Sequence, residues 1–164
     1  MGYYATYLDL VGKRCVVVGG EGEAVAKVEG LLRAEARVVV VAGAVDSALE
    51  DLASAGRIEV ARRGFDENDL EGAFLVIDAS GDDVSGERVA AAARARRVLV
   101  NVLDRPQLCD FIAPAIVRRG PLQVAISTNG RSPFMAAEIR RHLEQEITEA
   151  HGELVEMVGT TMNW

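Results

Sequence analysis

The sequence has few of the side chains that usually build metal centres and disulfide frameworks. Only two cysteines and two histidines occur among its 164 residues. Cys15 and Cys109 are too few for a disulfide framework. His142 and His151 both lie late in the chain, so we expect no Cys/His cluster and no metal site. The low cysteine usage fits a reducing compartment, and we predict a cytoplasmic protein.

Long apolar runs and an excess of positive charge are also missing. No stretch approaches the roughly 20 consecutive apolar residues that a membrane-spanning helix needs, and residues 1–10 lack the basic start of a signal peptide. The 18 Lys and Arg residues are outnumbered by 25 Asp and Glu residues, and the formal net charge is −7. Nucleic-acid binding needs a basic face, so we expect no nucleic-acid partner. Because no apolar run is long enough to span a membrane, we also expect no membrane partner.

The hydrophobic fraction of 49% is enough for the core of one domain with a small appendage. In the first two thirds of the chain, short apolar runs alternate with helical stretches. Strands are expected at 14–18, 37–42, 57–62, 73–79 and 98–102. Helices are expected at 23–35, 48–55 and 84–96. This alternation predicts an α/β protein with a doubly wound parallel sheet.

A glycine-rich turn joins the first expected strand to the first expected helix. Gly19, Gly20 and Gly22 lie within four positions, and the helix is expected to begin near Glu23. Such a turn lets a pyrophosphate approach the backbone and the free N–H groups of a helix N-terminus. Glu21 departs from the usual G-x-G-x-x-G/A pattern. A tight turn without a ligand is the alternative, but the flanking strand and helix favour dinucleotide binding.

Ligands of open parallel sheets bind at the carboxyl ends of the strands. Reading those ends together with the glycine turn, we predict a cofactor site at Gly19, Gly20, Gly22, Glu23, Gly43, Ala44, Asp78 and Ala79. No Lys or Arg lies between Val38 and Arg57 to receive a 2′-phosphate, which favours NAD over NADP. Asp46 is placed either to bind the ribose hydroxyl or to cap the next helix, and the two alternatives have equal weight.

After residue 104 the alternation stops. Apolar segments at 111–117 and 122–127 flank a polar turn and predict a hairpin. Ser132 and Pro133 then begin a helix as N-cap and first residue. An apolar stripe on that helix must pack on a partner chain or on the hairpin, and it consists of Met135, Ile139, Leu143 and Ile147. Gly152 is expected to interrupt the helical pattern and leave a short tail at 153–164.

One carboxylate, Asp104, directly follows the fifth expected strand. Its position at the carboxyl edge of the sheet makes it a candidate catalytic residue. An aspartate before a turn is more often a structural cap for neighbouring N–H groups, and this alternative stays open.

The segment that contains Asp104 has a specific pattern. Residues 101–115 read NVLDRPQLCDFIAPA, and they closely resemble a segment of the siroheme synthase N-terminal family. These proteins are precorrin-2 dehydrogenases, and some are also sirohydrochlorin ferrochelatases. Further similar segments are 17–20, 74–79 and 118–130, together with the helix start at Ser132-Pro133. The resemblance spans about residues 3–148.

The resemblance implies a Rossmann-like NAD-binding domain at 1–112, followed by a hairpin dimerisation region and a short helical segment at 113–164. It implies an intertwined homodimer that oxidises precorrin-2 to sirohydrochlorin with NAD⁺. Asp104 matches the family's proposed catalytic residue. The family's cofactor contacts fall on positions that match Gly22, Glu23, Gly43 and Ala44. Glu21 stands where the family usually has a third glycine, and Asn129 stands where it usually has Gly.

Precorrin-2 is a polycarboxylate, so basic and polar side chains near Asp104 and the hairpin are candidate substrate ligands. These are Asn101, Arg105, Arg118 and Arg131. Solvated surface arginines are the alternative for each single position. Two alternatives to a simple dehydrogenase remain: an enzyme with added ferrochelatase activity, and an inactive nucleotide-binding module.

Overall fold

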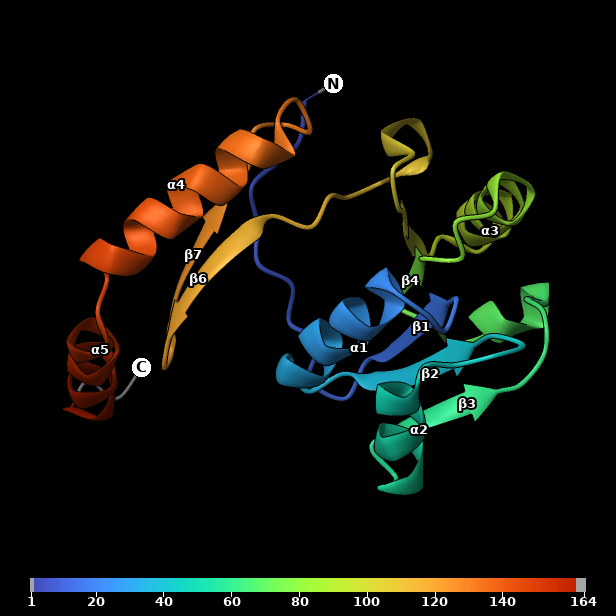
Figure 1. Ribbon diagram of the computed structural model, residues 1–164, viewed down its shortest axis with the longest axis horizontal. Helices are drawn as coiled ribbons and strands as arrows, with labels where there is room; N and C mark the ends of the chain where they lie inside the picture. Colours follow the sequence, from blue (N-terminus) through green and yellow to red (C-terminus); the bar gives the residue numbers. More distant parts are fainter. Residues whose placement is uncertain (1, 162–164) are drawn as a thin grey trace. The chain divides into compact units, whose positions relative to one another are not determined.

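The computed structural model describes residues 2–161, and the chain divides into two compact units. One unit comprises Ala5–Phe111, and the other comprises Met1–Tyr4 and Ile112–Trp164. Figure 1 shows the elements of each unit along the chain. Within residues 2–161, no helix combines the length and apolar content needed to cross a membrane.

The first unit is built on a five-stranded parallel sheet with the order β3-β2-β1-β4-β5. The strands are β1 (Arg14–Val18), β2 (Arg37–Val41), β3 (Ile58–Ala61), β4 (Leu75–Asp78) and β5 (Leu99–Val102). The central strands β1, β2 and β4 are rich in β-branched residues and almost entirely buried, as strands covered on both faces should be. The predicted doubly wound α/β fold is therefore confirmed.

Helices cover both faces of this sheet (Figure 1). They are α1 (Glu23–Arg33), α2 (Ser47–Ser54) and α3 (Asp83–Arg96), with short 3₁₀ turns η1 (Glu67–Leu70) and η2 (Pro106–Leu108). Neighbouring residues of β1 belong to separate cores: Val17 packs with Val28 of α1, and Val16 packs with Val89 of α3. The side chains of β1 thus fill two separate cores, one on each face of the sheet.

The second unit contains the predicted hairpin and helix. Strands β6 (Ala115–Arg119) and β7 (Leu122–Ile126) pair antiparallel, and they are followed by α4 (Pro133–Glu146) and α5 (Glu149–Thr161). The Ser132 hydroxyl accepts a hydrogen bond from the Met135 backbone N–H at 3.2 Å, which confirms the expected N-cap. On α4, Met135 and Ile139 are exposed, whereas Leu143 is only partly so.

The predicted short tail after Gly152 is wrong for the described residues. Gly152 lies inside α5 instead of ending a helix. A Cβ at this position would lie 2.3 Å from the Arg119 carbonyl oxygen, so the glycine lets α5 approach β6 closely. Residues 162–164 of the expected tail lie outside the described part of the chain.

Candidate cofactor and active site

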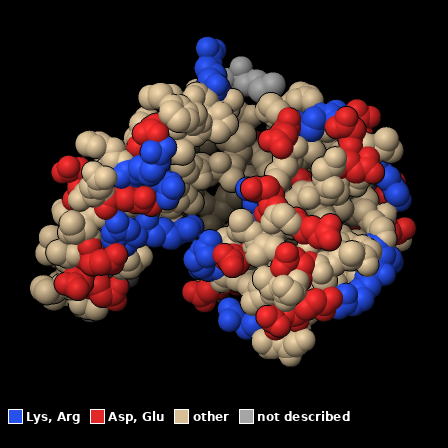
Figure 2. All heavy atoms as spheres, viewed as in Figure 1, with Lys and Arg blue, Asp and Glu red and all other residues tan. Residues whose placement is uncertain are grey.

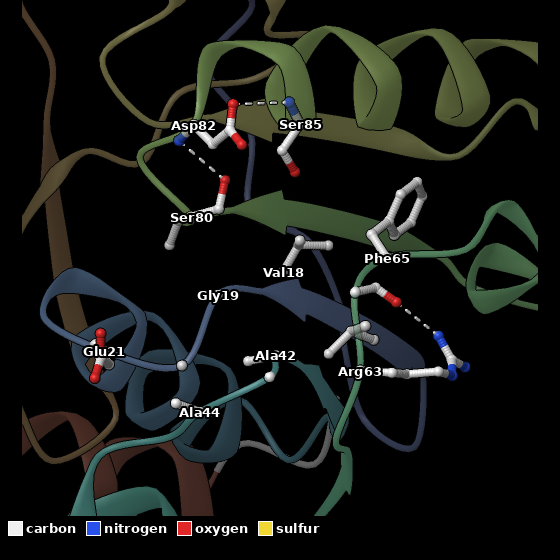
Figure 3. Close-up of a pocket in the computed structure, with 15 residues that line it drawn as sticks. Val18, Gly19, Glu21, Ala42, Ala44, Arg63, Phe65, Ser80, Asp82 and Ser85 are labelled. Atoms are coloured by element: carbon white, nitrogen blue, oxygen red, sulfur yellow. Dashed lines mark hydrogen bonds between the residues drawn. The ribbon is translucent and has the colours of Figure 1, made fainter.

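A cleft of about 370 Å³ opens at the carboxyl edge of the parallel sheet (Figure 3). Its lining residues lie at the ends of β1 and β2, in the segments that follow β1, β2, β3 and β4, and in the first turn of α3. They are Val18, Gly19, Gly20, Glu21, Val41, Ala42, Gly43, Ala44, Arg63, Gly64, Phe65, Ala79, Ser80, Asp82 and Ser85. Of the predicted cofactor residues, the cleft brings together Gly19, Gly20, Gly43, Ala44 and Ala79. Gly22, Glu23 and Asp78 lie outside its lining.

Two positions of the β1–α1 turn require glycine, because main-chain atoms of neighbouring segments lie very close to them. Gly19 has φ +106°, and a Cβ there would lie 2.7 Å from the Ala79 carbonyl carbon and oxygen. At Gly20, a Cβ would lie 2.3 Å from the Ala44 carbonyl oxygen. The turn is thus pressed against the segments that follow β4 and β2, and it presents bare backbone to the cleft.

The turn leads into α1, and no side chain makes a capping hydrogen bond at the N-terminus of this helix. Gly22 is the N-cap with φ 55° and ψ −118°, a conformation that is essentially limited to glycine. Glu21, which replaces the family's third glycine, is exposed and lines the cleft. The helix begins two residues after Glu21, the last cleft-lining residue of the turn, so its dipole and N–H groups suit an anion such as a pyrophosphate.

Asp78 ends β4 as a buried carboxylate. Its Oδ1 accepts a hydrogen bond from the Ser80 backbone N–H at 3.2 Å. Burial raises the pKa of the Asp78 carboxyl above its ordinary value. A Cβ at Gly86 of α3 would lie 3.1 Å from Asp78 Oδ2, so Gly86 is what allows α3 to lie directly over this carboxyl. Asp78 therefore lies beneath α3 and does not line the cleft.

The structure decides between the two alternatives for Asp46. Its Oδ1 accepts a hydrogen bond from the Ala48 backbone N–H at 2.9 Å and caps α2. The Asp46 backbone N–H in turn donates to the Gly20 carbonyl at 2.7 Å. Asp46 is therefore the helix cap, and it is not among the residues that line the cleft.

Two groups of cleft residues were missed by the reasoning from sequence. One follows β3 and consists of Arg63, Gly64 and Phe65. The other is the start of α3, where Asp82 Oδ1 accepts hydrogen bonds from the N–H groups of Val84 and Ser85. Figure 3 shows the bond to Ser85. The expected β3 strand was itself a usable signal, because its carboxyl end lies at the same sheet edge as the others.

Asp104 lies two residues beyond β5, at the same edge of the sheet as the cleft. It is exposed and has φ +59°, in the left-handed region that favours Gly, Asn and Asp. Among residues 2–161, its carboxylate has no hydrogen-bond partner. The capping role considered above is not seen in this part of the chain.

Partly buried hydrogen bonds hold the turn that carries Asp104. The Cys109 sulfur accepts a hydrogen bond from the Val102 N–H at 3.2 Å, and it also lies 3.3 Å from the Arg105 carbonyl oxygen. Asn101 is buried, and its side-chain amide donates to the Phe111 carbonyl oxygen at 2.9 Å. Asn101, a predicted substrate ligand, is thus engaged inside the unit.

The other predicted substrate ligands, Arg105, Arg118 and Arg131, lie in different parts of the structure. Arg105 forms ion pairs with two residues of α3, Asp83 at 2.5 Å and Glu87 at 3.2 Å. Arg118 lies on β6 and Arg131 lies before α4, both in the second unit.

Acidic and basic side chains are interspersed over the visible faces of both units (Figure 2). In the described chain, no group of three His, Cys, Asp or Glu residues is arranged to hold a metal ion.

A parallel sheet with a bare glycine turn and an uncapped helix at its carboxyl edge defines a protein of the dinucleotide-binding Rossmann class. Residues 6–115 match a family model described as NAD(P)-binding, and the chain belongs to that family. Residues 119–146 match the model for the central region of sirohaem biosynthesis proteins.

Individual relatives are more specific. The chain is 42% identical over 154 residues to siroheme synthase of Nitrosococcus oceani and 46% identical over 154 residues to siroheme synthase of Pseudomonas entomophila. Each alignment covers 94% of this chain and 33% of the relative, so the chain spans about a third of the length of these curated proteins. Its fold is similar to that of the solved precorrin-2 dehydrogenase SirC, with a TM-score of 0.80 and 28% identity, covering 94% of this chain and 76% of that one.

Proposed function

We propose that this chain is an NAD-dependent precorrin-2 dehydrogenase that forms sirohydrochlorin. The observation that carries the proposal is the likeness to SirC over 94% of the chain, together with the glycine-walled cleft at the sheet edge. The siroheme synthase relatives, which match over the same length, support the same reaction.

The residues of the cleft fit a nicotinamide dinucleotide. The bare backbone at Gly19 and Gly20 and the N-terminus of α1 suit the pyrophosphate. Gly43 and Ala44, which follow β2, suit the adenosine ribose. Because no Lys or Arg lies between the end of β2 and Arg57, we infer that the cofactor is NAD⁺ and not NADP⁺. The bound nicotinamide supplies the hydride acceptor.

We assign proton removal to Asp104. Oxidation of the macrocycle releases a hydride and a proton, and a carboxylate at the carboxyl end of β5 is suited to accept that proton. Asp104 is exposed and has no protein partner among the described residues, so it is free to contact a substrate. Arg105 is already paired with two carboxylates of α3, which makes it an anchor of this turn and a weak candidate for binding substrate carboxylates.

We further propose a homodimer formed through the hairpin and α4. On α4, Phe134, Met135 and Ile139 are exposed, at 67%, 48% and 39% of their surfaces. Exposed apolar side chains on successive turns of a helix suit a second copy of the chain. Arg118 and Arg131 belong to this same unit and remain candidates for the substrate's carboxylates. Both cysteines are free thiols, which fits the cytoplasmic location predicted from the sequence.

The proposed function is tested by incubating the protein with precorrin-2 and NAD⁺ and following the absorbance of NADH and of the tetrapyrrole. We expect stoichiometric formation of NADH and sirohydrochlorin. Binding of NAD⁺ without turnover would instead identify a nucleotide-binding module. Adding Co²⁺ or Fe²⁺ after the oxidation tests the further ferrochelatase activity, which would require Asp104 to take protons from the macrocycle nitrogens.

A further inference from the structure

The cleft contains one basic side chain among the lining residues of the described chain. This is Arg63, which follows β3, whereas Glu21 and Asp82 contribute negative charge. Arginine in a dinucleotide cleft commonly receives the 2′-phosphate of NADP, because its planar fork matches the phosphate oxygens. A free arginine here would conflict with the NAD⁺ preference inferred from the end of β2.

The guanidinium of Arg63 is already bound to a carboxylate of its own unit. Its Nη1 donates to Asp69 Oδ2 at 2.8 Å, and its Nη2 donates to Asp69 Oδ1 at 2.6 Å. Nη1 also donates to the Gly64 carbonyl at 3.1 Å. In Figure 3 the Arg63 side chain extends away from Gly19 and Ala44. The two-pronged face that would bind a phosphate is thus turned onto Asp69.

Asp69 is itself buried and makes further hydrogen bonds within the unit. It is 7% exposed and lies on η1. Its Oδ2 also accepts a hydrogen bond from the Asp66 N–H at 2.8 Å, and Arg14 donates to its backbone carbonyl at 2.5 Å. The Arg63 hydrogen bonds hold the pKa of the Asp69 carboxyl below its ordinary value, so Asp69 is ionised at neutral pH.

We propose that Asp69 is a specificity-determining residue, which disfavours NADP⁺ by keeping the Arg63 guanidinium away from a 2′-phosphate. This inference rests on the proposed function, because it concerns the same cofactor cleft. A 2′-phosphate that recruited Arg63 would have to break the paired hydrogen bonds and leave the buried Asp69 charge without its partner. A ribose with a free 2′-hydroxyl makes no such demand.

The test is a double-mutant cycle on Arg63 and Asp69, with dissociation constants for NAD⁺ and NADP⁺ measured by titration calorimetry. We expect Asp69→Asn to strengthen NADP⁺ binding by about tenfold, the effect of one released charge-assisted contact. NAD⁺ binding should change less than about twofold. In the Asp69→Asn background, Arg63→Ala should remove the gain, whereas in the wild-type background it should leave NADP⁺ binding nearly unchanged.

The neighbouring arginine provides a matched control. Arg62 forms an equivalent two-pronged pair with Glu50, at 2.7 and 2.6 Å, and does not line the cleft. Glu50→Gln changes the net charge by the same amount as Asp69→Asn and also releases an arginine. It should not strengthen NADP⁺ binding. An equal gain in both variants would mean that overall charge is responsible, and the proposal would be wrong.

Further outcomes decide the proposal even if one variant folds poorly. A folded Asp69→Asn protein, checked by circular dichroism, that binds NADP⁺ as weakly as the wild type overturns it. If Asp69→Asn does not fold, Arg63→Ala alone decides: unchanged NADP⁺ binding supports the proposal, and a tenfold loss overturns it. A wild-type protein that binds neither dinucleotide refutes the proposed function itself, and this inference with it.

Discussion

The left-handed conformation of Asp104 allows its chemical role to be separated from its effect on the backbone. Its φ of +59° is tolerated by Asn and Gly, whereas alanine in this region costs about 1 kcal/mol. A lower turnover of Asp104→Ala could therefore come from the missing carboxylate or from the lower stability of the turn. Asp104→Asn keeps the shape and the backbone preference and removes only the basicity.

If Asp104 accepts the proton, Asp104→Asn should lower turnover by about 10²- to 10⁴-fold. The free energy of unfolding should change by less than about 0.5 kcal/mol, as for an ordinary surface substitution. The dissociation constant for NAD⁺ should hardly change, because Asp104 is not among the cleft-lining residues. Asp104→Gly, which also accepts the left-handed turn, should match Asp104→Asn in turnover.

The assay combines steady-state oxidation of precorrin-2, NAD⁺ titration and urea denaturation of the same preparations. Asp104→Ala should be as inactive as Asp104→Asn but less stable by about 1 kcal/mol. An Asp104→Asn protein that turns over at the wild-type rate would remove Asp104 from the mechanism. A variant that loses NAD⁺ affinity and turnover together would indicate that Asp104 shapes the cofactor site instead.

Three further outcomes are expected. Gly20→Ala should weaken NAD⁺ binding and cost about 1–3 kcal/mol of stability, because the new Cβ would lie 2.3 Å from the Ala44 carbonyl oxygen; unchanged affinity by calorimetry would contradict this. Met135→Glu with Ile139→Glu should shift a dimer toward monomer in sedimentation at micromolar concentration, and a wild-type monomer would refute the proposed interface. Asp78→Asn should stabilise the protein at neutral pH, since burial raises the pKa of Asp78 in the folded state and its ionisation there opposes folding. That advantage should disappear as the pH falls through the raised pKa toward the ordinary value of 3.8, and urea denaturation at several pH values checks it.

The parallel sheet could be predicted well because its signal is local. The strand β1 has the bounds expected from its apolar run, and the N-cap of α4 follows from the Ser132-Pro133 pair. Gly152 was misread for the opposite reason. Its role depends on the Arg119 carbonyl, which lies more than 30 positions away in the chain. Without that information, a glycine in a helical pattern is read as the common signal for a helix end.

The candidate site was predicted in part. Gly19, Gly20, Gly43 and Ala44 follow from the rule that ligands bind at strand ends. That rule alone cannot show that Asn101 is committed to the Phe111 carbonyl or that Arg105 is committed to α3. Such pairings join segments 10 to 22 residues apart, and they depend on how the chain packs. The sequence supplies the charged groups, and the fold decides which of them are still available to a ligand.

The close backbone contacts at Gly19 and Gly20 also bear on how this protein can evolve. Any side chain at either position would meet main-chain atoms, which cannot rotate aside as a flexible side chain would. The glycine-lined end of the cleft should therefore tolerate single substitutions poorly. Changes of cofactor preference are therefore expected at the side chains around the cleft, such as Glu21 and Arg63, and at the residues that hold them, such as Asp69.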